Sequence, residues 1–296
     1  VIGHAANNSL VTVPVPMDPA RLTAALCPPA GRYAVVEVHE RLSSTNSRAV
    51  ELSRPYAVVL AEAQTAGRGR LDRSWESPAG LGLTFSAVLP APVNVPGWVP
   101  LAAGLAVAEA VTAVTGLRPQ LKWPNDLLVS GLDASGDTAG APQGAIDPGS
   151  GKVCGILCEY LPLPEPLVVV GVGLNVHQRR ADLPVTTATS LALALGVGED
   201  RLDREALSVA VLQRLAVRVD QLGGSAAERE ATQTAYRQVC ATVGTLVTVT
   251  FPDGRAVMGT ALDVDGDGAL VVDDGQQIHT LHAGDVTHVR PGQQAR

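Results

Sequence analysis

Short apolar runs, each ended by glycine, proline or polar residues, recur along this chain of 296 residues. YAVVLAEA at 56–63, LGLTFSAVL at 81–89 and PLVVVGVGLNV at 166–176 have the length and composition of buried strands. All of them fall well short of the roughly 20 apolar residues that a membrane helix needs. The chain is therefore predicted to build a packed core from strands, and we expect no membrane span.

Helical patterns lie between and after these strands. The stretch 98–116 is amphipathic and closes at Gly116, and SSTNSRAVELS at 43–53 opens a helix with Ser44 or Thr45 as its cap. Further strands are predicted at 33–40, 119–130 and 152–161, and further helices at 19–26, 203–223 and 225–244. The fold class is therefore α+β.

Composition and turn residues divide the chain into three parts. Residues 1–32 are rich in proline and are expected to be a poorly ordered lead-in. Residues 33–240 hold the α+β pattern, interrupted at 130–151 by a Gly/Ala/Ser/Asp/Pro-rich stretch that predicts a flexible loop. Residues 241–296 carry short alternating strands separated by PDG, DGDG and DDG turns, which predicts a small β-barrel domain.

The chain is acidic overall, with a net charge of −7 and a pI near 5.4. This argues against general nucleic-acid binding. The four cysteines are too sparse for a disulfide framework and the N-terminus lacks a secretory signal, so we expect a cytoplasmic protein. Lys122 and Lys152 are the only lysines among 22 basic residues. Either they persist by chance, or these two positions require a compact ammonium rather than a guanidinium.

The stretch QTAGRGRLDRSW at 64–75 concentrates positive charge in a predicted loop. Gly67 and Gly69 allow the backbone to approach a ligand closely, and Arg68, Arg70 and Arg73 offer guanidinium groups suited to carboxylate and phosphate oxygens. Taken alone, the stretch is equally consistent with a solvated arginine-rich loop or an RGG-like RNA contact. We call residues 64–77 the Gly/Arg loop.

Three further stretches carry polar residues at the ends of apolar strands. They are KWPNDLL at 122–128, GKVCGILCE at 151–159 and GVGLNV at 171–176. The proline in the first marks a strand end that opens onto a site. In the competing structural interpretation, Trp123 is a core residue and Lys122 forms a surface ion pair with Asp126.

No metal site is predicted with direct protein ligands. Cys154 and Cys158 share one face of a predicted strand without a second ligand pair, so they are interpreted as small hydrophobic residues. DVDGDG at 263–268, with Asp274, matches part of a calcium loop, but its flanks are β-like and a hairpin turn is the better interpretation. Ligand spacing is also lacking at His177, His279, His282 and His288.

Taken together and in this order, the motifs resemble the catalytic domain of the biotin protein ligases. They are SSTN, QTAGRGRLDRSW, SPAGLGLTFS, KWPNDLL, GKVCGILCE and GVGLN, between about residues 35 and 176. The stretch GTALDVDGDGALVV resembles the small domain that follows the core in this family. The resemblance implies a mixed β-sheet catalytic domain of the biotin/lipoate ligase type with packed helices over 33–240, and an SH3-like β-barrel over 241–296.

The resemblance also implies a two-step reaction. Family members convert biotin and Mg-ATP to biotinyl-5'-AMP and pyrophosphate, and then transfer biotin to one lysine of the biotin carboxyl carrier domain of acyl-CoA or pyruvate carboxylases. The cofactors are therefore ATP and Mg²⁺, with biotin as substrate. Two anions must meet in this reaction, which accounts for the local concentration of cations.

The resemblance assigns roles residue by residue. The catalytic residues are Lys152, Arg68, Arg70 and Lys122. The biotin-binding residues are Ser44, Thr45, Asn46, Gln64, Arg68, Gly69, Arg70, Lys152, Gly155 and Gly171. The ATP- and adenylate-binding residues are Gly67, Arg68, Arg70, Arg73, Trp75, Lys122, Asn125, Asp126, Asn175 and Arg290. Mg²⁺ is expected to enter with ATP, near Asp126 and through water.

Other expectations concern partners and rival functions. About 34 residues precede the first catalytic strand, too few for the DNA-binding domain of some relatives, so a monofunctional ligase without DNA binding is expected, as a monomer or weak dimer. The Gly/Arg loop is expected to be mobile without ligand and to close over the adenylate. The rivals are a lipoate or octanoate ligase or transferase of the same fold, and a non-catalytic biotin-sensing or RNA-binding module.

Overall fold

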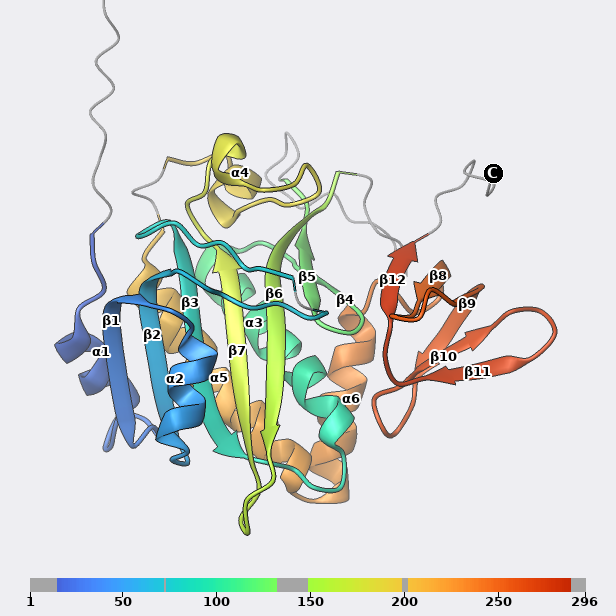
Figure 1. Ribbon diagram of the computed structural model, residues 1–296, viewed down its shortest axis with the longest axis horizontal. Coiled ribbons are helices and arrows are strands. Elements are labelled where there is room, and N and C mark those ends of the chain that lie inside the picture. Colours follow the sequence, from blue (N-terminus) through green and yellow to red (C-terminus); the bar gives the residue numbers. More distant parts are fainter. Residues whose placement is uncertain (1–14, 72, 132–148, 199–201, 289–296) are drawn as a thin grey trace, which may run out of the picture.

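A computed structural model describes residues 15–71, 73–131, 149–198 and 202–288 (Figure 1). Its centre is a mixed sheet of seven strands in the order β1-β2-β3-β7-β6-β5-β4. The strands are β1 (Val35–Leu42), β2 (Ala57–Gln64), β3 (Gly82–Pro90), β4 (Gln120–Lys122), β5 (Asp126–Val129), β6 (Gly151–Leu161) and β7 (Leu167–Asn175). Only the β1–β2 pair is parallel within this sheet, so the mixed β-sheet that we expected is confirmed.

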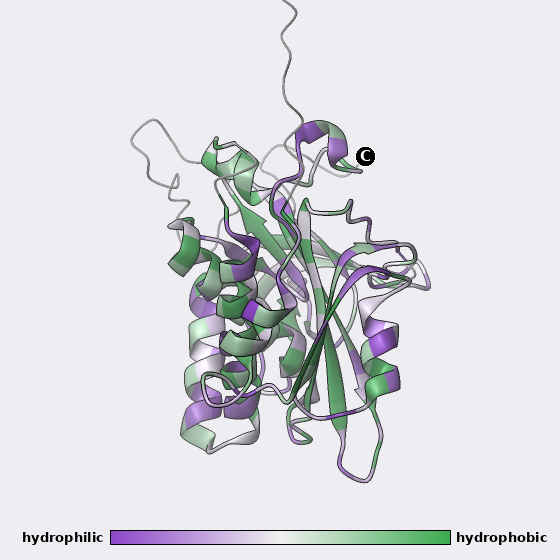
Figure 2. Ribbon diagram, turned by 90° about the vertical axis from the view of Figure 1, so that its left-hand side faces the viewer, coloured by the Kyte–Doolittle hydropathy of each residue, from purple (hydrophilic) through white to green (hydrophobic). Residues whose placement is uncertain are grey.

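Helices cover the two faces of the sheet unequally (Figure 1). On one face lie α3 (Val99–Thr115), α5 (Arg204–Gly223) and α6 (Ala226–Val239), and on the other lies α2 (Thr45–Leu52). Three shorter helices are η1 (Pro96–Trp98), η2 (Arg180–Asp182) and α4 (Leu191–Leu195). Figure 2 shows that the strands of the large sheet are predominantly hydrophobic, because they are enclosed between these layers.

The segment Pro96–Thr115 is long and apolar enough to cross a membrane by composition alone. In the fold α3 packs on one face of the sheet beside α5, and most of its residues are buried. It ends at Gly116, whose φ of 77° is a left-handed conformation that glycine adopts without strain. This segment is therefore a core helix.

Polar side chains cap the starts of three helices. Ser44, rather than Thr45, caps α2, because its hydroxyl accepts a hydrogen bond from the backbone N–H of Ser47. Asp203 caps α5, and Ser225 and Glu228 form a reciprocal capping box at the start of α6. The last helix ends at Val239, five residues before the predicted end at 244.

The sequence-based prediction of one strand over 119–130 is wrong. These residues form a hairpin in which β4 pairs antiparallel with β5, and Lys122 lies opposite Asp126. The turn between the strands contains Pro124, which has no N–H to donate to a ladder. The hairpin brings both ends of the KWPND motif to the same edge of the sheet.

The lead-in that we expected to be poorly ordered is packed in its described part, from residue 15 onward. Helix α1 (Pro19–Leu26) buries Leu22 and Leu26 completely. A buried ion pair lies beside it, with 2.6 Å between Nη1 of Arg204 and Oε2 of Glu62. The other Glu62 oxygen accepts the backbone N–H of Met17 at 2.6 Å, so this pair anchors the start of the described chain to β2 and α5.

The C-terminal part forms an antiparallel sheet of five strands in the order β11-β10-β9-β8-β12. They are β8 (Leu246–Thr250), β9 (Ala256–Val264), β10 (Leu270–Asp273), β11 (Ile278–Leu281) and β12 (Asp285–His288). The small β domain is confirmed, and within the described residues it is an open sheet with β11 and β12 at its edges. The DGDG stretch is a hairpin turn between β9 and β10, as predicted, and Asp265 accepts backbone N–H groups inside it.

The small sheet packs directly on the large domain. The indole N–H of Trp98 donates to the carbonyl of Asp265 at 3.0 Å, and the indole N–H of Trp123 donates to the carbonyl of Gly268 at 3.0 Å. Both tryptophans are buried, and the hydrophobic core continues from α3 into β8 and β10. Trp123 is thus a core residue that also fixes the position of the small domain.

Candidate functional site

A cavity of about 670 Å³ lies between the large sheet, the Gly/Arg loop and the small domain. This volume is within the usual range for small-molecule sites. Every predicted site residue lines the cavity except Gly67, which lies on the adjacent surface, and Arg290, which is outside the described residues. Segments that are far apart in the sequence therefore converge on one site.

Glycines of the two central strands form the floor of the cavity. Gly155 of β6 lies opposite Gly173 of β7, and Gly171 faces the same side as Gly173. A Cβ atom on Gly171 would lie 2.0 Å from Oδ1 of Asn46, and one on Gly173 would lie 2.2 Å from the ring of Trp75. The floor therefore excludes any side chain larger than hydrogen. Gly173 was missing from the predicted set, although the GVG repeat gave a signal for it.

A polar cluster stands at one end of the floor. The side-chain oxygen of Gln64 accepts hydrogen bonds from the backbone N–H of Thr45 at 2.8 Å and from its hydroxyl at 3.1 Å. The hydroxyl of Ser86 donates to Oδ1 of Asn46 at 2.6 Å and lies 2.8 Å from Oγ1 of Thr45. Ser86 was not predicted, and its only signal was a polar residue inside an apolar strand.

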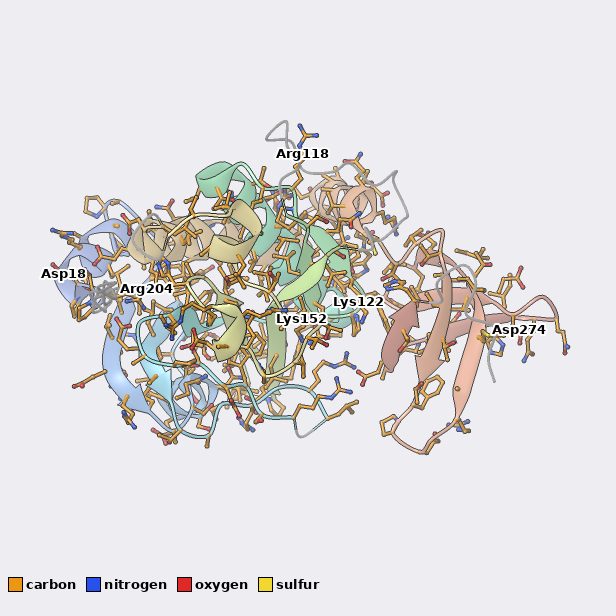
Figure 3. All side chains as sticks on the ribbon, turned by 90° about the horizontal axis from the view of Figure 1, so that it is seen from above. Asp18, Arg118, Lys122, Lys152, Arg204 and Asp274 are labelled. Atoms are coloured by element: carbon orange, nitrogen blue, oxygen red, sulfur yellow. The ribbon has the colours of Figure 1, made fainter. Side chains whose placement is uncertain are left out.

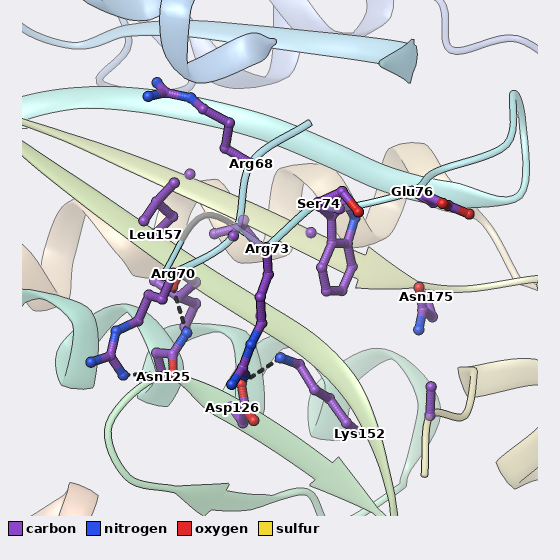
Figure 4. A pocket seen from close by; sticks show the side chains of 18 of the residues that line it. Arg68, Arg70, Arg73, Ser74, Glu76, Asn125, Asp126, Lys152, Leu157 and Asn175 are labelled. Atoms are coloured by element: carbon purple, nitrogen blue, oxygen red, sulfur yellow. Dashed lines mark hydrogen bonds and ion pairs between the residues drawn. The ribbon is translucent and has the colours of Figure 1, made fainter. Parts of the chain in front are cut away.

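Lys152 lies over Gly155 of the floor, and Figure 4 shows it directed at Asp126. The distance from Nζ of Lys152 to Oδ1 of Asp126 is 2.6 Å, and Nζ lies 5.8 Å from the centroid of the Trp75 ring. The backbone of Lys152 is held by Thr187, whose carbonyl accepts its N–H at 2.8 Å. Asp126 thus pairs with Lys152, and not with Lys122 as the structural interpretation of KWPND proposed.

The three arginines of the Gly/Arg loop point in different directions. Figure 4 shows Arg70 and Arg73 extending towards Asn125 and Asp126, while Arg68 is directed away from them. Arg70 donates to Oδ1 of Asn125 at 3.3 Å, and Arg73 forms an ion pair with Asp285. Asp285 lies at the start of β12 in the small domain and was not predicted. The small domain therefore contributes a carboxylate to the rim of the cavity.

Arg68 forms an ion pair with Glu159 at 2.8 Å, and Glu159 also accepts a hydrogen bond from Nδ2 of Asn46 at 2.7 Å. Glu159 was quoted within the GKVCGILCE motif but was given no role. Asn175, at the end of β7, donates to the carbonyl of Thr189 at 3.0 Å and so braces the segment that covers the cavity from above.

Two cations of the cavity are partly withdrawn from water. Burial lowers the pKa of Lys122, and the nearby charge of Lys152 lowers it further, while Asp126 opposes the shift. Burial also lowers the pKa of the Arg70 guanidinium. Figure 3 shows Lys122 and Lys152 close together near the centre of the molecule. Two ammonium groups so placed favour a ligand that carries several negative charges.

A resident metal ion does not fit this cavity. No group of three His, Cys, Asp or Glu side chains comes together within the described ranges. Asp126 and Asp285 are already paired with cations. Burial raises the pKa of the Cys158 thiol to about 12 and that of Cys154 further, so both thiols stay protonated at neutral pH.

Two family models and several known proteins match this chain. Residues 38–176 match the model of the "Biotin/lipoate A/B protein ligase family", and residues 244–289 match that of the "Biotin protein ligase C terminal domain". The biotin--[acetyl-CoA-carboxylase] ligase of Mycobacterium tuberculosis is 35% identical over 93% of this chain and 97% of its own length. The bifunctional ligase/repressor BirA of Bacillus subtilis is 38% identical, but over only 33% of this chain and 32% of its own length.

Solved structures give the same fold. The biotin protein ligase from Aquifex aeolicus in complex with biotin and ATP aligns with a TM-score of 0.66 at 24% identity, over 87% of this chain and 100% of that one. A point mutant of that Aquifex ligase in complex with biotin aligns with a TM-score of 0.68 at 24% identity, over 88% of this chain and 100% of that one.

Proposed function

This chain belongs to the biotin protein ligase family, and we propose that the cavity joins biotin to the α-phosphate of ATP between Lys152 and the Gly/Arg loop. The observation that carries this assignment is the convergence of Lys122, Lys152, Arg70 and Arg73 on one cavity with an uncharged, glycine-floored end. A site of this kind suits a ligand with an apolar body and one carboxylate next to a polyphosphate.

In the first step, a carboxylate oxygen of biotin attacks the α-phosphorus of ATP. The bond from phosphorus to the bridging oxygen breaks, and pyrophosphate leaves. Lys152, presented by β6 at the middle of the cavity, is proposed to neutralise the charge shared by the carboxylate and the α-phosphate. Arg70, Arg73 and Lys122 are proposed to hold the phosphates, since their side chains line the same end.

The ring system of biotin is proposed to lie over Gly155, Gly171 and Gly173. Thr45 and Gln64 stand beside this floor, where their hydrogen-bonding groups face the cavity. Because the glycines have no side chains, the Trp75 ring and the Asn46 amide pack close to the strand backbone, and the bicyclic ring is proposed to lie against these two groups. Among the described residues, every cation at the end of the cavity beside Thr45 and Gln64 is paired with a carboxylate. This neutral environment suits the uncharged ureido ring.

In the second step, the amine of an acceptor lysine attacks the carbonyl carbon of the mixed anhydride, and AMP leaves. No protein nucleophile is needed, and the thiols of Cys154 and Cys158 stay protonated at neutral pH. We propose a biotin carrier domain of an acyl-CoA or pyruvate carboxylase as acceptor, in the cytoplasm, where ATP is available. The ligase is proposed to act as a monomer or weak dimer without binding DNA.

Mg²⁺ is proposed to enter with the triphosphate and to keep most of its waters, since the described part of the cavity supplies no cluster of ligands. Asp126 is the carboxylate nearest to the expected phosphates and could contact the ion through water. The Gly/Arg loop is proposed to close over the adenylate and to exclude water between the two steps.

The test is the exchange of pyrophosphate into ATP by the purified chain with Mg²⁺, comparing biotin, lipoate and octanoate. Biotin-dependent exchange that is lost in Lys152→Ala supports the proposal. Exchange with lipoate or octanoate alone would identify the sister activity. Absence of exchange with all three acids, together with retained biotin binding, would make the chain a non-catalytic biotin sensor.

A further inference from the structure

We propose that Glu159 is a positioning residue for biotin, acting through Asn46 and Arg68. This inference rests on the proposed function of the cavity. Glu159 does not line that cavity, but its carboxylate receives hydrogen bonds from two residues that do. Glu159 therefore connects Asn46, which lies against the floor of the cavity, with Arg68 of the Gly/Arg loop.

The position of Glu159 follows from the pleat of β6. Side chains alternate along a strand, so Gly155, Leu157 and Glu159 face the same side of the sheet. The glycine forms the floor, the leucine lines the cavity, and the glutamate reaches the rim. One strand thus carries the floor and the group that fixes the residues above it.

The contacts fix the orientation of the Asn46 amide. Its Nδ2 donates to Oε2 of Glu159 at 2.7 Å, and its Oδ1 accepts from the Ser86 hydroxyl at 2.6 Å. A flipped amide would place Nδ2 against the Ser86 hydroxyl and Oδ1 against a carboxylate. Asn46 is only 5% exposed, so water cannot readily replace a lost partner. The orientation matters because Oδ1 lies directly over Gly171.

The same carboxylate holds the first arginine of the Gly/Arg loop. Nη2 of Arg68 lies 3.0 Å from Oε1 and 2.8 Å from Oε2 of Glu159. This contact explains why Arg68 points away from Arg70 and Arg73 in Figure 4. A continuous chain of contacts therefore runs from Arg68 through Glu159, Asn46 and Ser86 to Thr45.

A simple surface ion pair is the competing explanation, and it makes a different prediction. Exposed pairs contribute little to stability, and the Arg68 side chain is 48% exposed. If Glu159 only paired with Arg68, removing its charge would slightly lower stability and leave substrate binding unchanged. A positioning role instead affects biotin selectively, because the affected groups stand at the biotin end of the cavity.

The experiment is a double-mutant cycle with Glu159→Gln and Asn46→Asp. Glutamine keeps one acceptor oxygen, whereas the carboxylate accepts from Arg68 with both oxygens and from Asn46 with Oε2, so in either amide orientation at least one of these contacts is replaced by opposed N–H groups. Asn46→Asp alone would place two carboxylates 2.7 Å apart. In the double variant, the introduced glutamine can accept from Arg68 and donate to the introduced aspartate, which still accepts from Ser86. The contact between the two positions is then restored with donor and acceptor exchanged, while one of the two Arg68 contacts and the long 3.5 Å contact from position 46 to the Leu157 carbonyl are lost.

We expect Glu159→Gln to raise KM for biotin about tenfold in pyrophosphate exchange, with KM for ATP changed by about twofold or less. The double variant should recover most of the loss, to within about threefold of the parent chain. Glu165→Gln, an exposed change in the same β6–β7 hairpin, is the matched control. Tm is measured for each variant.

Three results would overturn the inference. The first is an unchanged KM for biotin in Glu159→Gln. The second is an equal rise in KM for biotin and ATP. The third is additive losses in the double variant. If Asn46→Asp fails to fold, the inference is tested by Glu159→Gln alone. The change in its KM for biotin is then compared with the change in its KM for ATP. Biotin-dependent exchange by the parent chain is measured first, and its absence would refute the proposed function rather than the role of Glu159.

Discussion

The Nζ atom of Lys152 lies 2.6 Å from Oδ1 of Asp126, at the centre of the cavity. Arg73 is paired in the same way with Asp285, and Arg68 with Glu159. These cations at the site are thus compensated by carboxylates on the protein itself. An incoming biotin carboxylate and triphosphate must compete with these carboxylates, so ligand binding is an exchange of anionic partners.

The Arg73–Asp285 pair predicts a contribution of the small domain to nucleotide affinity. Asp285→Asn removes the competing charge, so KM for ATP should fall while KM for biotin stays constant. An exposed pair contributes at most about 1 kcal/mol, which limits the gain to about fivefold. Pyrophosphate exchange at varied ATP measures it. Asp253→Asn, at an exposed pair in the same domain, is the control, and a higher KM for ATP would contradict this account.

The Gly/Arg loop predicts ligand-dependent protection. Cleavage by trypsin after Arg68, Arg70 or Arg73 should slow in the presence of biotin and ATP, because closure over the adenylate buries the loop. Cleavage products identified by mass spectrometry report the sites. Equal cleavage with and without both ligands would count against closure, and cleavage elsewhere in the chain provides the internal control.

Gly171→Ala tests the floor of the cavity. The added Cβ would meet Oδ1 of Asn46 at 2.0 Å, so the asparagine must move and KM for biotin should rise about tenfold or more. Gly223→Ala, at a helix end where a Cβ meets nothing within 4 Å, is the matched control and should leave exchange unchanged. Similar exchange kinetics in both variants would show that the floor does not need glycine.

Lys122→Met separates stability from function. Burial lowers the pKa of Lys122, so its charged form costs stability in full at every pH below that lowered pKa, and the cost disappears as pH rises from there to the ordinary value of 10.5. At pH 7 the methionine variant should therefore have a higher Tm, but a KM for ATP raised about tenfold. Calorimetry and pyrophosphate exchange measure the two. A lower Tm in Lys122→Met would show that the charge of Lys122 stabilises the folded chain.

His288 predicts acid sensitivity of the small domain. Burial first, and then the charge of Lys122, lowers its pKa from 6.5 to about 4. The unfolded chain therefore binds a proton that the folded chain does not between these values, and stability falls as pH drops from 6.5 to about 4. His288→Gln should flatten this part of the Tm profile. His282→Gln, at an exposed position, should leave the slope as it is in the parent chain.

Much of the fold could be predicted because the signals were local. Continuous apolar runs indicated β2, β3 and β7, and Ser44 and Gly116 marked helix ends by the hydrogen bonds and dihedral angles that such residues favour. The hairpin at 120–129 was missed although Pro124, Asn125 and Asp126 are turn-forming residues, because the apolar residues on both sides of them were joined into one predicted strand.

The sequence by itself determined the long apolar strands, the cap of α2 and the residue types able to bind anions, since these depend on neighbours within a few positions. Only the tertiary structure decided which charge pairs with which. Asp126 faces Lys152 rather than Lys122, and Asp285 reaches Arg73 from another domain. Glu159 reaches Asn46 across 113 residues of chain. Such pairs depend on how the strands align and how the domains pack, and no local pattern records the distance between residues that are remote in sequence.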